Sequence, residues 1–473
     1  MVRTNAVSAL SDSSSPRPQR VPTRVRSARV YDDPFRLALV LLIVVTLSKF
    51  GGYFGILRLM RPAMVLFAFC AGYALLHPKK IILTNLQRSV TVRLLVGIGL
   101  VAIGSAAFGI SLGRSATFIL NNFSKTLAIA FLMIVTVRDI HDLRRLTWAF
   151  TFGSILLAFL SIFVIGISKV STGVSYDAND VGVLMVMSLP LAVLFVQAAS
   201  TKGERFVALM GIGLMAATLV KTQSRGAFIG ALIVCPALLI MPGVTASRRF
   251  LLVAAAVVTM VFAAPSGYWT SMQSILSDPK ADYNWDAVNG RRNIARRGIG
   301  YMISYPVFGV GINNFALAEG TISDKARNLV RGQGIRWAAP HNSFVQAGAE
   351  SGVTGLLLWV SLVLANVAIP LRLVRRIPKA WRKGTPDQRF LAFAALYLPI
   401  AQLGFLVTAF FVSFAWLEPL YFFSALVAGL GIIAARELRP VTAVNSRTGF
   451  RSRRSSPSPA LTSQPTAAAS QPA

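Results

Sequence analysis

The sequence predicts an all-α polytopic membrane protein, and three observations support this fold class. Of its 473 residues, 54% are hydrophobic and only 14% are charged, whereas soluble domains carry about 25% charged residues. The mean hydropathy is +0.61. The apolar residues also fall in long runs, and about 17 to 25 such residues cross the hydrocarbon core as a helix. These observations exclude an ordinary soluble globular protein.

Twelve or so membrane spans follow when these runs are taken in order. The predicted spans are 35–51, 60–76, 92–112, 115–137, 146–168, 181–199, 206–220, 226–243, 249–265, 343–370, 390–412 and 416–435. The first nine spans therefore lie within 35–265 and the last three within 343–435. Between them, the loop 266–342 is rich in aromatic residues, and we expect it to form a small helical cap.

The charge distribution predicts which side of the membrane each loop occupies. The chain carries 48 Lys and Arg against 17 Asp and Glu, a formal net charge of +31. In a soluble domain this excess would suggest nucleic acid, but here the basic residues lie between apolar runs, so we predict no nucleic-acid partner. With both tails cytoplasmic, the predicted inner segments hold 31 of the 48 basic residues, as the positive-inside rule requires. The loop 266–342 is then periplasmic.

The two tails, 1–34 and 436–473, have a different composition. Both are rich in Ser and Pro and carry several arginines, which predicts basic, disordered segments that could rest on anionic membrane lipids. The two cysteines, Cys70 and Cys235, lie inside apolar runs without the spacing of a metal site. We therefore expect no bound metal and no cofactor.

Three motifs occur in a fixed order around the large loop. The first, Thr-Gln-Ser-Arg-Gly-Ala at 222–227, opens a span on the outer side. The second, Gly-Arg-Arg at 290–292, precedes the proline- and glycine-punctuated run 305–315. The third, Pro-His-Asn-Ser-Phe at 340–344, leads into Glu-Ser-Gly-Val-Thr-Gly at 350–355. In this order, the chain resembles the O-antigen ligase and polysaccharide polymerase superfamily of bacterial inner-membrane glycosyltransferases.

The resemblance extends over roughly residues 170–370 and implies an activity. It implies a GT-C-like bundle that transfers a glycan from undecaprenyl pyrophosphate to an acceptor hydroxyl on the periplasmic face, with inversion and without a metal ion. The acceptor is a lipid A core in ligases, a growing polysaccharide in polymerases, and a protein hydroxyl in other members. The sequence does not distinguish these acceptors.

Arginines are suited to the pyrophosphate of such a donor, because a guanidinium binds phosphate oxygens in pairs and keeps its proton. Arg225 begins a span at headgroup depth, so we expect it to bind the donor pyrophosphate. Its alternative role is that of an interfacial arginine that reaches toward lipid headgroups. Arg291 and Arg292 are both candidates for a second arginine of the donor site, with a lipid-facing basic helix as the alternative.

His341 is the candidate catalytic residue. The other two histidines, His77 and His141, fall in predicted cytoplasmic loops. A neutral imidazole on the outer side can accept the proton of an acceptor hydroxyl as that hydroxyl attacks the anomeric carbon. The alternative is that His341 only positions the acceptor.

Glu350, Lys125 and Asn179 are supporting candidates. On a straight helix Glu350 lies about 13 Å beyond His341, so we expect it to pair with Arg225 or Arg291 in the bundle interior. Lys125 lies near the middle of a span and is a candidate contact for the donor.

Asn179 and the neighbouring Asp180 begin another span on the outer side. Their side chains suit either an acceptor sugar or a helix N-cap. We favour the cap, because Asn and Asp are preferred at that position.

A transporter or flippase for an anionic or lipid-linked substrate is the alternative function. Basic residues inside a helical bundle also serve translocation. Against this, the sequence shows no internal repeat of the kind that transporters carry, and the candidate residues concentrate on one side of the membrane. Substitution of His341 distinguishes the two functions, since a transporter has no obvious need for a base.

Overall fold

The computed structural model describes residues 33–164, 176–242, 267–273, 290–328 and 337–438, with isolated residues between 247 and 264. Within these ranges every regular element is helical, which confirms the all-α class. The described ranges contain nine helices that are long and apolar enough to cross a membrane. The protein is therefore a polytopic membrane protein.

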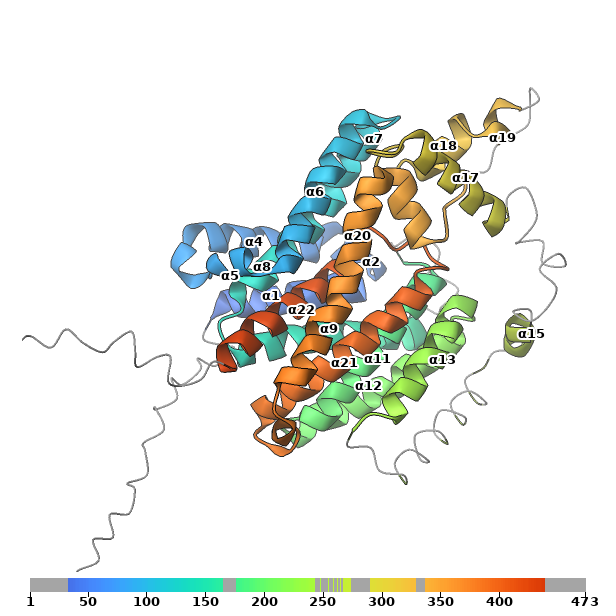
Figure 1. The fold of residues 1–473 in the computed structure, drawn as a ribbon. Coiled ribbons are helices and arrows are strands. Elements are labelled where there is room, and N and C mark those ends of the chain that lie inside the picture. Colours follow the sequence, from blue (N-terminus) through green and yellow to red (C-terminus); the bar gives the residue numbers. More distant parts are fainter. Residues whose placement is uncertain are drawn as a thin grey trace, which may run out of the picture.

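The described elements follow one another along the chain as helices (Figure 1). The first part contains α1 (Pro34–Ser48), α2 (Phe50–Tyr53), α3 (Gly55–Met60), α4 (Pro62–Leu76), α5 (Thr84–Arg88), α6 (Val90–Phe108), α7 (Leu112–Phe118), α8 (Ser124–Thr136) and α9 (Ile140–Phe159). The second part contains α11 (Ala178–Ala198), α12 (Lys202–Lys221), α13 (Arg225–Leu239), α15 (Tyr268–Gln273), α17 (Arg291–Ser304), α18 (Phe315–Thr321) and α19 (Asp324–Arg327). The last part contains α20 (Ser343–Arg376), α21 (Pro386–Thr408) and α22 (Glu418–Glu437).

The nine candidate spans correspond to nine of the spans predicted from the sequence. The predicted spans 35–51 and 226–243 appear as α1 and α13, apolar helices of 15 residues each. The predicted span 249–265 lies almost entirely outside the described residues.

The start of α9 differs from the prediction, because the helix begins at Ile140 and the predicted span began at 146. Asp139 caps this helix by accepting a hydrogen bond from the backbone N–H of Asp142. Arg144 lies in its first turns and forms an ion pair of 2.8 Å with Glu204 of α12. Hydropathy locates only the apolar part of a helix, whereas its cap and ion pairs extend it toward the membrane surface.

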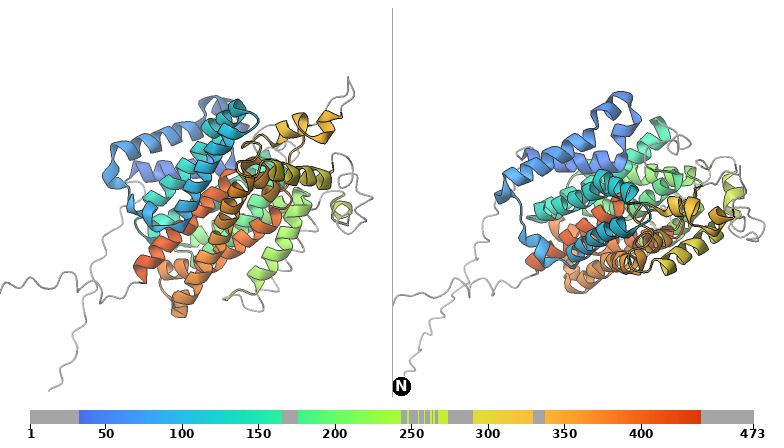
Figure 2. Two further views of the ribbon diagram at one scale, coloured as in Figure 1. Left: turned by 45° about the horizontal axis from the view of Figure 1, so that its top comes forward. Right: turned by 90° about the horizontal axis from the view of Figure 1, so that it is seen from above.

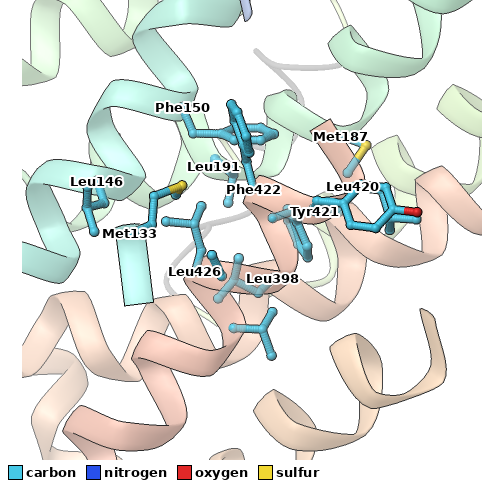
Figure 3. Close-up of a cluster of buried hydrophobic side chains, with 14 of the residues drawn as sticks. Met133, Leu146, Phe150, Met187, Leu191, Leu398, Leu420, Tyr421, Phe422 and Leu426 are labelled. Carbon is cyan, nitrogen blue, oxygen red and sulfur yellow. The ribbon is translucent and has the colours of Figure 1, made fainter. Parts of the chain in front are cut away.

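The core lies where five helices meet (Figure 3). The clustered side chains are Met133 of α8, Leu146 and Phe150 of α9, Met187 and Leu191 of α11, Leu398 of α21, and Leu420, Tyr421, Phe422 and Leu426 of α22. In α11 and α22, 83% of the apolar membrane-spanning stretch is buried inside the protein, whereas in the Gly55–Leu76 span only 11% is buried. Since lipid is as apolar as leucine, close packing holds these helices together, and the Gly55–Leu76 span presents its surface to lipid.

One end of the bundle carries α17 and α18 together with the connection 409–417 between α21 and α22 (Figures 1 and 2). The backbone N–H of Ser343, at the start of α20, donates to Ala409 O at 2.7 Å. Ser105, near the end of α6, donates from Oγ to Glu350 O at 2.6 Å. We call this end of the bundle the α17 end.

Helix α20 is broken at Gly352, where φ is 71° and ψ is −175°. A Cβ atom at this position would lie 2.5 Å from the carbonyl carbon of Val307, and L-residues rarely adopt this φ. The next residue, Val353, donates its N–H to Pro306 O at 2.7 Å. The break therefore lets the chain around 306–307 cross α20 at backbone contact.

Candidate functional site

His341 is held by the connection 409–417. Its backbone N–H donates to Ser413 Oγ at 2.9 Å. Two residues later, Ser343 donates from Oγ to Val412 O at 2.8 Å and accepts from the N–H of Phe414 at 3.0 Å. The main chain on both sides of the histidine ring is therefore anchored independently of the ring.

The backbone at His341 lies in the left-handed region, with φ of 46°, and the side chain is partly exposed. Asn342 caps α20 by accepting from the N–H groups of Phe344 and Val345 at 2.9 and 3.1 Å. Gln223 and Asn313, in the other two motif regions, also have positive φ, at 53° and 62°. Strained non-glycine residues concentrate at functional sites, and three of the five in the described ranges lie in these motif regions.

Arg225 approaches the same connection from α13. Ser224 caps that helix by accepting from the N–H of Ala227 at 3.3 Å, so Arg225 is its first residue. The next residue, Gly226, lies against Phe411, and a Cβ atom there would be 2.6 Å from Phe411 Cβ. The first and third motifs, more than a hundred residues apart, thus meet at 409–417.

This contact gives a test of the arrangement. Gly226→Ala should destabilise the protein by about 1–3 kcal/mol, because the added methyl group would overlap a Cβ atom that cannot rotate away. Thermal unfolding of the detergent-purified protein measures the effect. Gly213→Ala in α12 is the matched control, since a Cβ atom there would meet nothing within 4 Å. Equal unfolding midpoints for the two variants would contradict the close approach.

The structure distinguishes the two arginines of the second motif. Along α17 the buried residues are Ile294, Gly298 and Tyr301, which share one face of the helix. Arg291 precedes Ile294 by one turn, lies on this face and is partly buried, whereas Arg292 is exposed. Of the two side chains, Arg291 therefore lies on the face that packs against the rest of the protein.

Helix α17 runs beside the beginning of α20 in the same direction. Gly298 packs against Val345, and one turn later Met302 lies beside Gly348, where a Cβ atom would be 2.6 Å from the methionine sulfur. Since α17 begins two turns before Gly298 and α20 begins only two residues before Val345, the start of α17 extends beyond the start of α20. Arg291 thus lies at the same end of this helix pair as the third motif.

A buried ion pair joins α17 to α18. The Arg297 guanidinium donates to both oxygens of the Glu319 carboxylate, at 2.8 Å from Nε and 2.6 Å from Nη2. Tyr301 donates from Oη to the same carboxylate at 2.9 Å. Burial, together with the Glu319 charge, raises the pKa of the Tyr301 phenol well above its usual value. Sequence reasoning missed Glu319, which lies 22 residues from Arg297 and in another helix.

Glu350 is buried at the junction between the bundle and α18. One carboxylate oxygen accepts from Trp416 Nε1 at 2.6 Å and the other accepts from the backbone N–H of Phe315 at 3.1 Å. The expected pairing with Arg225 or Arg291 was wrong. The connection 409–417 supplies the indole, and the run 305–315, which crosses α20 at its break, supplies the backbone N–H.

The run 305–315 is held between α20 and the turn from α6 to α7. The backbone N–H of Val310 donates to Ala349 O at 2.8 Å, and Val310 O accepts from the N–H of Ile110 at 2.9 Å. Ser115 of α7 donates from Oγ to Ile312 O at 2.7 Å. The second and third motifs are thereby locked to the first half of the chain.

Arg114 is a further candidate that sequence reasoning missed. Its Nε donates to Asn313 O at 2.8 Å, and its guanidinium lies 5.8 Å from the centre of the Trp337 ring. Trp337 lies four residues before His341 in the sequence, so the fold brings Arg114 close to the third motif. The available signal was an arginine in a short outer turn between two predicted spans.

Lys125 and Asn179 lie outside the network described above. Lys125 is partly exposed and follows a π-helical turn, Ile119–Phe123; such turns are frequent at functional sites. It forms no ion pair with a carboxylate of the described residues. Asn179 lies in the first turn of α11, which Asp177 and Asp180 cap reciprocally at 2.9 and 3.1 Å.

The N-cap is Asp177, and Asp180 completes the capping box, so the cap is confirmed for Asp180, whereas the role of Asn179 stays a prediction. In the ranges that the structure describes, no three His, Cys, Asp or Glu side chains lie close enough together to hold a metal ion. The candidate site therefore consists of His341, Arg225, Arg291, Glu350 and Arg114, gathered around the start of α20.

Comparison with protein families matches residues 210–360 to the family described as O-antigen ligase. The matched range begins in α12, contains Arg225 and α17, and ends in α20 after His341 and Glu350. A comparison with curated proteins finds no match. The resemblance seen in the three motifs is confirmed, and the matched domain is that of an enzyme family.

Proposed function

From the premise that residues 210–360 form an O-antigen ligase domain, we propose that this enzyme transfers a glycan from undecaprenyl pyrophosphate to an acceptor hydroxyl. The observation that carries the proposal is the convergence of Gly226, the neighbour of Arg225, and of His341 on the connection 409–417. It supplies a cation for the leaving group and a base for the acceptor at one end of the bundle. We propose that this end faces the periplasm.

The charge distribution supports that orientation. The segment 371–389, at the other end of α20, carries seven Lys and Arg. Basic residues accumulate in cytoplasmic loops. Both termini are then cytoplasmic in the bacterial inner membrane, and the segment 266–342 caps the periplasmic face of about twelve spans.

In the proposed reaction, the acceptor oxygen attacks the anomeric carbon from the side opposite the pyrophosphate. A new carbon–oxygen bond forms while the bond from the anomeric carbon to the phosphate oxygen breaks, and its electron pair leaves with the pyrophosphate. The acceptor proton passes to the imidazole of His341. Attack from the opposite side inverts the configuration, and no step requires a metal or another cofactor.

The arginines stabilise the charge that develops on the pyrophosphate. Arg225 and Arg291 are assigned to this role, because a guanidinium binds two phosphate oxygens at once. Arg292 is exposed on α17 and is assigned to lipid headgroups. Lys125 stays a candidate donor contact within its span, and Asn179 a low-ranking acceptor contact.

A reconstituted transfer assay tests the proposal. It combines the purified protein in proteoliposomes with an undecaprenyl-pyrophosphate glycan and three acceptors: a lipid A core, a second lipid-linked glycan and a Ser/Thr peptide. Transfer should survive EDTA and fall by about 10²–10³-fold in Arg225→Ala, since one stabilising donor of the leaving group is lost. Arg225→Lys should keep part of the activity, because the charge remains without the paired geometry.

Arg205→Ala is the control. This exposed arginine lies near the start of α12, whereas Arg225 follows the end of that helix. Unchanged transfer in Arg225→Ala would remove the donor-site assignment and leave the enzyme class intact. Loss of transfer in EDTA would contradict metal independence. Absence of transfer to every acceptor, with glycan crossing the bilayer, would favour the transporter or flippase.

A further inference from the structure

A cavity lies between α20 and α22, far from the α17 end of the bundle. Its volume is about 650 Å³, within the range of about 300–1,000 Å³ that is typical of ligand pockets. Arg372 and Arg376 line it from the last two turns of α20, and Leu438 lines it at the end of α22. None of the residues described above as the candidate site contributes to it.

The only charged side chains that line this cavity are two arginines. Arg372 and Arg376 are one helical turn apart, so they lie on the same face of α20, and both are exposed. The lining contains no Asp or Glu. Neither arginine forms an ion pair with a carboxylate in the part of the chain that the structure describes.

The rest of the lining is apolar and partly formed by small residues. Ile369 lies one turn before Arg372 on α20, and Leu373 is buried between the two exposed arginines. On α22, Gly431 and Ala435 carry little or no side chain, and a Cβ atom at Gly431 would be in van der Waals contact with Ile369 Cγ2, 3.5 Å away. The cavity thus has a cationic end toward the membrane surface and an apolar end toward the membrane interior.

We propose that this cavity binds an anionic phospholipid, with the phosphate between Arg372 and Arg376 and the upper acyl chains along Ile369 and Leu373. Basic pockets between membrane helices suit anionic headgroups, and the apolar lining suits the chains. The protein's own C-terminal tail does not supply the missing negative charge, since residues 439–473 contain no Asp or Glu. The lipid would bridge α20 and α22.

Lipid binding to the full-length protein in a neutral detergent tests this site. Phosphatidylglycerol is titrated against phosphatidylcholine and inorganic phosphate, with native mass spectrometry and the thermal unfolding midpoint as readouts. Phosphatidylglycerol should bind and raise the midpoint, because a ligand that binds only the folded state stabilises it. In Arg372→Gln/Arg376→Gln its apparent Kd should rise roughly thirtyfold, the factor expected for two headgroup arginines.

Lys379→Gln/Lys383→Gln is the matched control, since it removes the same charge from exposed positions outside the lining and should bind like wild type. Ala435→Leu should weaken binding without any change in charge, because it fills the apolar part. Binding of phosphatidylcholine equal to that of phosphatidylglycerol would overturn the proposal, as would an unchanged Kd in the double arginine variant. Equal stabilisation by inorganic phosphate alone would show an anion site that does not recognise lipid.

Discussion

His341→Ala should lower the rate of glycan transfer by about 10²–10⁴-fold, the usual contribution of a general base, while donor binding is retained. The loss is expected because the ring, under the proposed function, accepts the acceptor proton. The fold should survive, since the contact of His341 with Ser413 is made by its backbone N–H, which alanine keeps. Transfer and donor binding are measured on the same reconstituted samples.

The left-handed backbone at His341 calls for a second variant. Alanine at φ of 46° carries a conformational cost of about 1–2 kcal/mol, which could itself disturb the site. His341→Asn avoids most of this cost, because Asn tolerates that region better, and it provides no base. His77→Ala, at an exposed position, is the control. Transfer above a tenth of the wild-type rate in His341→Asn would exclude the histidine as the base.

Glu350→Ala should abolish transfer and also destabilise the protein by about 2–5 kcal/mol. The variant leaves two donors, Trp416 Nε1 and the Phe315 N–H, without their acceptor, and each unsatisfied buried donor costs about 1–3 kcal/mol. Trp416 belongs to the connection that holds His341, so its release should displace the catalytic ring. The thermal unfolding midpoint and the transfer rate are measured together.

Glu350→Gln separates anchoring from chemistry. Glutamine keeps one side-chain oxygen and can satisfy one of the two donors, so both stability and transfer should lie between those of wild type and Glu350→Ala. Glu437→Ala, at an exposed position on α22, is the control for loss of a carboxylate. If Glu350→Gln were as stable as wild type yet inactive, the carboxylate would act in the reaction itself. An unfolding midpoint of Glu350→Ala equal to that of wild type would contradict the anchoring role.

Membrane character and most spans could be predicted from the sequence, because the free energy of moving a helix into lipid is a sum over neighbouring residues. The limits appear at the helix ends. The start of α9 lies six residues before the predicted one, since Asp139 and the ion pair of Arg144 with Glu204 involve polar residues that hydropathy excludes.

The order of the three motifs was also readable, and it identified the family that the comparison then matched over 210–360. The roles of individual residues within the motifs were harder to predict from the sequence. Arg291 and Arg292 are equivalent in composition, and only the packing of α17 on α20 separates the partly buried side chain from the exposed one. Arg114 and Glu319 belong to no motif, and their importance follows from contacts with distant parts of the chain.

By itself, the sequence determined that the protein is a helical membrane protein with an O-antigen ligase domain, since hydropathy and motif order are properties of the chain read in one dimension. Only the tertiary structure decided which side chains meet. Glu350 binds Trp416 and Phe315, where an arginine was expected, because the connection 409–417 packs on the start of α20 and the break at Gly352 admits the chain at 306–307. Such a partnership depends on segments brought together by folding, and no local pattern encodes it.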